Sequence, residues 1–145
     1  MISIKEINSK NSKSCYELDY KSIKHWNQNQ WEKELEKDDV TAMGVYFKNS
    51  IIGVCVIHKI FNEVEIRYLS VHPLYQKRGI GKKLIYQIFK DCNKENIKRI
   101  FLEVSCKNKR ALRFYDIFGF ETISIRKRYY KDGSDALLKE KKMLN

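Results

Sequence analysis

Long apolar runs are missing from this sequence, and their absence excludes one large class of proteins. No stretch approaches the roughly 20 apolar residues that a helix needs to cross a bilayer. Nothing at the N-terminus resembles a signal peptide, because MISIKEINSKNSK has no long apolar core after its charges. Proline is nearly absent, and there is no repeat, linker or low-complexity segment. We therefore expect a single domain over residues 1–145 that is soluble, cytoplasmic, monomeric and without a membrane partner.

Closely spaced cysteines are missing as well. Cys15, Cys55, Cys92 and Cys106 lie far apart, and no C-x-x-C pair is present for zinc or redox chemistry. The three histidines are also scattered, so the sequence predicts no metal site. We expect free thiols, buried or half-buried, in a reducing compartment.

Positive charge is in excess and is concentrated in one part of the chain. The formal net charge is +11. Residues 1–76 hold ten basic and ten acidic side chains, whereas residues 77–113 hold twelve basic and three acidic ones. A polyanionic partner would explain this segment. The other explanation is that the chain is rich in Lys, Asn and Ile throughout and accumulates surface lysines without a binding role.

The order of the predicted elements indicates an α/β fold. A first strand at residues 2–7 is followed by helices over about 14–24 and 29–37, then by three strand-like runs separated by KNS and FNE, which suit antiparallel hairpins. From Gly79 the apolar residues recur at helical spacing. A strand at 98–106, a helix closed by Gly119 and two last strands follow. This order predicts a mostly antiparallel sheet with a central parallel βαβ crossover that joins residues 66–71 to 100–106.

The stretch VHPLYQKRGIGKKLI places Gly79 and Gly81 between a predicted strand and a predicted helix. Glycine lets backbone approach a ligand closely, and the first N–H groups of a helix have no internal partner and carry the positive end of its dipole. Such a turn is an anion cradle, with phosphate as the expected ligand. A Walker loop is excluded because Lys83 stands in place of the hydroxyl residue, and a dinucleotide fingerprint because Leu84 stands in place of the third glycine.

The motif that remains is Gln76-x-x-Gly79-x-Gly81, followed by an Asn-x-x-Ala-x-x-x-Tyr-x-x-x-Gly-Phe pattern over residues 108–120. Together, in this order, the two patterns resemble the signature of the GNAT superfamily of acetyl-CoA-dependent N-acetyltransferases. The resemblance implies a GNAT-like sheet with helices on both faces, and coenzyme A with its pyrophosphate over the N–H groups of residues 77–82. The residues it implies for binding acetyl-CoA are Leu69, Ser70, Val71, Lys77, Arg78, Gly79, Ile80, Gly81, Lys82 and Asn108.

Three segments resemble the RimI-type members, which acetylate the N-terminal alanine of a small-subunit ribosomal protein. They are HWNQNQW, FLEVSCKNKRALRFYDIFGF and IRKRYYKDGSDA, so the likeness runs from about residue 25 to residue 136. It departs at His25, where a proline is usual, at Ser134, where a glutamate is usual, and at Lys139, where an apolar residue is usual. Ser134 bears on substrate choice, and Lys139 predicts a differently packed or displaced last strand.

The implied reaction is attack of an amine on a thioester. An α-amine with a pKa of about 8 is mostly protonated at neutral pH, so the reaction needs a base, a stabilised oxyanion and a proton for the leaving thiolate. Glu103 is the predicted base, since a carboxylate within an apolar mid-sheet strand is costly unless partnered, and the resemblance assigns it this role. Tyr115 is the predicted acid. The alternatives are a solvated carboxylate at a strand end and an aromatic core residue.

The acceptor is less well defined by the residues. Trp26, Tyr129 and Tyr130 are candidates for binding it, although each could equally be a core residue. The resemblance implies the N-terminus of a ribosomal protein as the partner, with no nucleic acid required. A GNAT enzyme for a polyamine or an antibiotic stays open, because acceptor sites are built from variable loops. A non-catalytic ribosome-binding module is disfavoured, because the carboxylate, the phenol and the glycine turn are all present.

Overall fold

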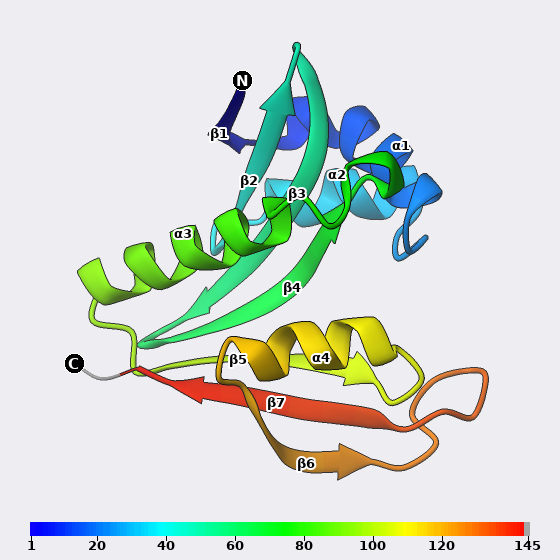
Figure 1. Ribbon diagram of the computed structural model, residues 1–145, viewed down its shortest axis with the longest axis vertical. Coiled ribbons are helices and arrows are strands. Elements are labelled where there is room, and N and C mark those ends of the chain that lie inside the picture. The colour runs from blue at the N-terminus through cyan, green and yellow to red at the C-terminus, as the bar shows by residue number, and fades with distance from the viewer. Residues whose placement is uncertain (144–145) are drawn as a thin grey trace.

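The computed structural model describes residues 1–143 and is built around one seven-stranded sheet with the order β1-β2-β3-β4-β5-β7-β6 (Figure 1). The strands are β1 (Ile2–Ile7), β2 (Val40–Phe47), β3 (Ser50–Ile60), β4 (Glu63–Val71), β5 (Arg99–Ser105), β6 (Glu121–Arg126) and β7 (Ala136–Lys142). The neighbouring strands are antiparallel except β4 and β5, which are parallel. The predicted α/β class, with a mixed and mostly antiparallel sheet, is confirmed.

The helices cover both faces of the sheet (Figure 1). They are α1 (Ser12–Lys21), α2 (Gln28–Glu36), α3 (Ile80–Lys94) and α4 (Lys109–Ile117). One core lies between α1, α2 and the sheet, and a second core lies on the opposite face beneath α3 and α4. The predicted apolar stripe of α3 is buried in the second core, from Ile80 to Cys92. Within residues 1–143, no helix is both long and apolar enough to span a membrane.

The parallel crossover joins the two predicted strands, but their pairing is short. β4 pairs with β5 through Glu63–Arg99, Val64–Ile100 and Glu65–Phe101, so residues 66–71 lie beyond the paired part of the two strands. The pairing of β3 with β4 shifts register so that Arg67 is an extra residue on β4. A bulge of this kind bends the strand and increases its twist. The two strands begin side by side and then diverge (Figure 1), which leaves a gap between them.

The bulge also explains why two consecutive side chains of β4 reach the same face. Neighbouring residues of a regular strand point to opposite faces. Here Arg67 Nε donates to Glu34 Oε2 of α2 at 2.7 Å, and the Tyr68 hydroxyl donates to Asp19 Oδ1 of α1 at 3.1 Å. Both helices are therefore fastened to the strand at the point where it leaves β5.

The connection between α1 and α2 is held by one carboxylate. Asp19 is 0% exposed. Besides the Tyr68 hydroxyl, it accepts hydrogen bonds from the backbone N–H groups of His25 and Trp26 at 2.9 Å, and from Trp31 Nε1 at 2.9 Å. Residues 22–27 are thereby fixed against the sheet.

Of the two alternatives expected for the last strand, displacement is wrong, whereas a different packing is found around Lys139. β7 pairs with β5 from Arg99–Lys142 to Ser105–Ala136 and with β6 on its other side. Lys139 is 3% exposed, and its Nζ donates to Asp116 Oδ1 at 2.7 Å and to Thr122 Oγ1 at 3.1 Å. The ion pair with α4 accommodates the charge in a regular strand.

All four thiols are free, as predicted. Cys15, Cys55 and Cys92 are buried, and Cys106 is half-buried. Burial raises the pKa of Cys15 and of Cys92 to about 12. These thiols are protonated at neutral pH and are structural, because the thiolate is the reactive form.

Candidate active site

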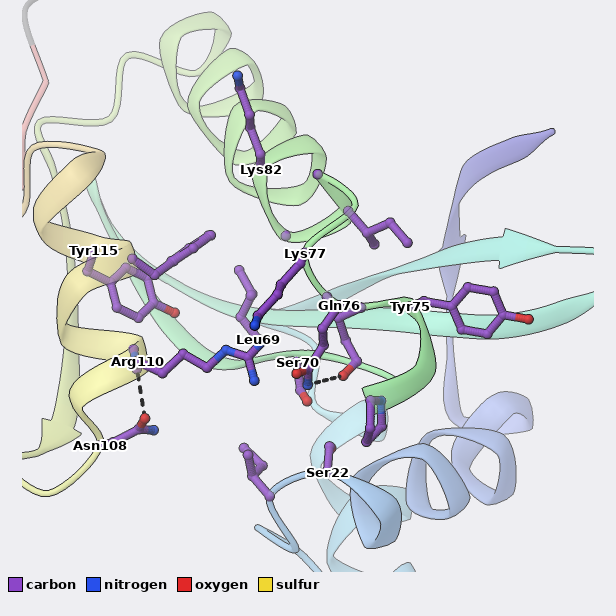
Figure 2. A pocket seen from close by; sticks show the side chains of 18 of the residues that line it. Ser22, Leu69, Ser70, Tyr75, Gln76, Lys77, Lys82, Asn108, Arg110 and Tyr115 are labelled. Atoms are coloured by element: carbon purple, nitrogen blue, oxygen red, sulfur yellow. Dashed lines mark hydrogen bonds between the residues drawn. The ribbon is translucent and has the colours of Figure 1, made fainter.

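A cavity of about 700 Å³ lies at the divergence of β4 and β5. Its walls come from the end of β4, the loop and first turn of α3, and α4, together with Ser22 and Ile23 of the α1–α2 connection (Figure 2). This volume is in the usual range of small-molecule sites, about 300–1,000 Å³. The lining includes Leu69, Ser70, Val71, Lys77, Gly79, Ile80, Gly81, Lys82, Asn108 and Tyr115, all singled out in the sequence.

The glycine turn leaves the N-terminus of α3 open. Gly79 is the N-cap residue, with φ +80°, and within the described chain no side chain caps the helix. At Gly81 a Cβ atom would lie 3.2 Å from the ring of Phe114, so any side chain there would press on that ring and narrow the approach to the helix start. Gln76 Nε2 donates to the Val71 carbonyl at 2.9 Å and ties the loop to β4. The bare backbone and the uncapped N–H groups suit an anionic ligand.

Two basic side chains reach into the cavity from opposite walls. Figure 2 shows Lys77, from the loop, and Arg110, from α4, pointing toward its centre, whereas Lys82 points away along α3. Arg78 does not line the cavity, and its guanidinium lies 5.5 Å from the centre of the Tyr75 ring. The sequence analysis did not single out Arg110. Its signal is helical spacing, since it precedes the cavity-lining Phe114 by four residues.

Tyr115 is both a core residue and a cavity residue. Its ring packs edge-on against Phe114 and Phe120, with centroids 5.2 and 5.3 Å apart, and its hydroxyl is directed toward the cavity (Figure 2). Burial, and secondarily the nearby Cys55, raise the pKa of Tyr115 well above its usual value. The phenol is therefore protonated at neutral pH and can donate a hydrogen bond or a proton.

Asn108 begins the helix that carries Tyr115. Its side-chain oxygen accepts from the Ala111 N–H at 3.1 Å, which is an N-cap, and the residue also lines the cavity. The two interpretations of Asn108, as a cap and as a ligand contact, are therefore compatible.

Glu103 does not line this cavity. It points to the sheet face opposite to Leu102 and Val104, which pack beneath α3 and α4. Its side chain is 25% exposed, yet Oε2 is buried, and in residues 1–143 that atom has no hydrogen-bond partner. Nearby Tyr130 has a raised pKa, caused first by burial and then by the negative charge of Glu103. The carboxylate thus stands at the gap, partly shielded from water, on the face away from the cavity.

The three candidate acceptor residues divide between two places. Tyr129 and Tyr130 pack edge-on, with centroids 5.2 Å apart, in the β6–β7 connection near Glu103. Trp26 is half-buried and packs on Trp31 and Tyr68, so it belongs to the core beneath α1 and α2. From the same connection, Ser22 and Ile23 line the cavity instead. No local sequence pattern predicted Ser22 and Ile23 as cavity residues, because their position depends on the tertiary contacts of Asp19.

No group of three or more His, Cys, Asp or Glu side chains in the described residues is arranged to hold a metal ion.

The fold and the site agree with the comparison to known families. The chain belongs to the acetyltransferase (GNAT) family, whose model matches residues 5–120. The protein is accordingly an enzyme of the N-acetyltransferase class.

The chain is similar to several named acetyltransferases. The chain is 34% identical over 89 residues to the [ribosomal protein bS18]-alanine N-acetyltransferase of Haemophilus ducreyi, which covers 60% of this chain and 61% of that protein. The match thus spans about three fifths of the relative's length. The crystal structure of the ribosomal-protein-S18-alanine N-acetyltransferase from Escherichia coli has a TM-score of 0.91 at 20% identity, covering 100% of this chain and 97% of that one. The PaiA N-acetyltransferase of Thermoplasma acidophilum, solved in complex with coenzyme A, has a TM-score of 0.83 at 22% identity, with 99% of each chain covered. At these identities the two structures show a shared fold.

Proposed function

We propose that this protein transfers the acetyl group of acetyl-CoA to the α-amine of the N-terminal alanine of a small-subunit ribosomal protein, in the cytoplasm and as a monomer. The observation that carries the proposal is that the expected binding and catalytic groups lie around the gap between β4 and β5. An anion cradle and a buried phenol lie on one face, and a shielded carboxylate oxygen with two tyrosines lies on the other. The names of the relatives from H. ducreyi and E. coli support the choice of acceptor.

The cavity suits acetyl-CoA. We place the pyrophosphate over the uncapped N-terminus of α3, beside Lys77 and Arg110. From Leu69 to Val71, β4 pairs with β3 and is free on the side of β5, so the pantetheine amides can add there like another strand. The bound co-substrate supplies an acetyl group activated as a thioester.

Glu103 and Tyr115 act from opposite faces of the gap. Glu103 Oε2 accepts a proton from the acceptor amine, directly or through a water, because no donor within residues 1–143 is bonded to this oxygen. A backbone N–H near Val71 stabilises the negative charge that develops on the carbonyl oxygen. Tyr115, kept protonated by its raised pKa, donates to the departing sulfur. One proton is thus removed on the acceptor side and another is delivered on the thiol side.

A thiol-release assay with acetyl-CoA tests the acceptor. A peptide that begins Ala-Arg-Tyr, polyamines and aminoglycosides are compared in parallel, and mass spectrometry separates α-amine from lysine acetylation. We expect turnover of the peptide with acetate on its α-amine. Turnover of a small amine without peptide activity would replace this proposal by the small-amine alternative.

Glu103→Gln tests the base. Turnover should fall on the order of 10²–10⁴-fold at neutral and lower pH, where the amine arrives protonated, and recover in part at high pH, where it arrives neutral. Glu121→Gln is the matched control, since Glu121 is exposed on β6, the strand on the far side of β7 from Glu103. Full activity of the Glu103 variant at every pH would leave deprotonation to solvent and remove this residue from the mechanism.

A further inference from the structure

Arg126, the last residue of β6, places its guanidinium beside Glu103 Oε2, the buried oxygen that has no hydrogen-bond partner in the described residues. Its Nε lies 3.6 Å from Glu103 Oε2, and in residues 1–143 no other basic side chain comes within ion-pair distance of that carboxylate. This separation exceeds a hydrogen bond. The oxygen therefore experiences the positive charge while its lone pairs stay available to another donor.

The sheet register brings the two side chains together across β7. Glu103 pairs with Leu138, and Arg126 pairs with Ala136, two residues away on the same strand. Since alternate residues share a face, all four side chains are on one face. Arg126 must pass over β7 at Ala136, whose small side chain is 0% exposed. The guanidinium also lies 5.3 Å from the centre of the Tyr129 ring, which holds it on this path.

We propose that Arg126 is a positioning residue that keeps Glu103 ionised and turned toward the gap until the acceptor amine takes its place. The inference rests on the proposed function, because it concerns the base of that reaction. An opposite charge at this distance favours the ionised carboxylate. The arginine side chain is 57% exposed and can turn to solvent when an ammonium group arrives, so two cations compete for one carboxylate.

Within residues 1–143, three groups face Glu103. Arg126 comes from β6, Tyr130 from the β6–β7 connection, and Leu138 from β7 is neutral. Tyr130 has a raised pKa and is uncharged over the range in which carboxylates and amines titrate. Removing the arginine should therefore leave the Glu103 carboxylate without the counter-charge that now lies 3.6 Å away.

The test is the pH profile of peptide acetylation at saturating acetyl-CoA for the parent protein, Arg126→Ala and Arg126→Lys. We expect Arg126→Ala to move the acidic limb upward by about 0.5–1 pH unit, a shift reduced by the exposure of the pair. Its rate should then be about 3- to 10-fold lower below that limb and equal to the parent rate at high pH. Arg126→Lys should restore most of the parent profile, and the KM for acetyl-CoA should not change.

Lys131→Ala is the matched control, because it removes the same charge from the β6–β7 connection at an exposed position. Its acidic limb should coincide with that of the parent. A loss in Arg126→Ala that is equal at every pH, or a limb that moves as far in Lys131→Ala, would overturn the inference in favour of a structural or general charge effect.

Two outcomes separate this inference from the proposed function. If a small amine is acetylated and the peptide is not, the proposed acceptor is wrong, and the same limb shift measured with that amine still decides the role of Arg126. Carboxyl-carbon NMR of Glu103 against pH needs no acceptor. A titration midpoint that is identical in the parent and in Arg126→Lys and Arg126→Ala would overturn the inference, whereas an upward move in Arg126→Ala alone supports it.

Discussion

Asp19 is a fully buried carboxylate whose loss should cost the fold several hydrogen bonds at once. Asp19→Ala leaves four donors without their acceptor: the backbone N–H groups of His25 and Trp26, the Trp31 indole and the Tyr68 hydroxyl. The consequence is both a weaker fold and a released α1–α2 connection. The second effect matters for function because Ser22 and Ile23 of that connection line the cavity.

The size of the loss follows from which donors can find water. The two backbone groups lie in a surface connection and can turn to solvent. Trp31 and Tyr68 are 0% and 3% exposed, and a buried donor left unsatisfied costs about 1–3 kcal/mol. The Trp31 indole loses its acceptor, whereas the Tyr68 hydroxyl keeps a long contact of 3.4 Å with Ser22 Oγ. With a smaller contribution from the connection, we expect the free energy of unfolding to fall by about 2–4 kcal/mol. This is a large share of the 5–15 kcal/mol that is typical of a domain.

Urea unfolding measures this change, with Glu17→Ala as the control from the exposed side of the same helix. The control should stay within about 0.5 kcal/mol of the parent. Affinity for acetyl-CoA should fall only modestly in Asp19→Ala under folding conditions, because the α3 cradle is formed by other residues and only the Ser22 and Ile23 wall of the cavity is released. A loss below about 1 kcal/mol would refute the assignment of Asp19 as the anchor of this connection.

Three further expectations concern the cavity. Gly81→Val forces a side chain against Phe114, where overpacking costs about 1–3 kcal/mol. Calorimetry should therefore show about 5- to 150-fold weaker acetyl-CoA binding, with folding retained. Unchanged affinity would contradict the assignment of this turn as the anion-binding site. Dephospho-coenzyme A should bind more weakly than coenzyme A, and added salt should narrow the difference; equal affinity at every salt concentration would favour lysine accumulation without a binding role. Tyr115→Phe should lower kcat on the order of 10²–10⁴-fold with little dependence on amine protonation; a loss that follows the acidic limb would argue against its role as the acid.

The elements with strong local signals could be predicted from the sequence. The helical spacing from Ile80 to Cys92 predicted α3, and these residues are buried together. Gly119, with φ +88°, ends α4 in the left-handed conformation that glycine allows, and Phe120 N–H bonds the Tyr115 carbonyl at 3.0 Å. The cavity-lining turn was predictable for the same reason, since its glycines, its helix start and its preceding strand are adjacent in the chain.

The extent of the parallel pairing could not be predicted in this way. It ends at Glu65 because Arg67 bulges from β4, and that bulge is supported by Glu34 and by Asp19 through Tyr68, both distant in sequence. The surroundings of Glu103 could not be predicted either, since they depend on where the β6–β7 connection folds back. Lys139 departs from the usual apolar residue, but its partner Asp116 on α4 keeps the strand regular, which no pattern within the strand indicates.

The early end of β4–β5 pairing has a consequence for the exchange of backbone hydrogens with solvent. Beyond the bulge, from residue 68 to residue 71, the N–H groups of β4 alternate between those that bond β3 and those that face the gap. The first row should exchange slowly, and the second row should exchange at the rate of locally exposed amides. A ligand that adds to β4 as a strand would slow the second row alone. Its binding would then appear as protection with a period of two residues along one strand, with β3 unchanged.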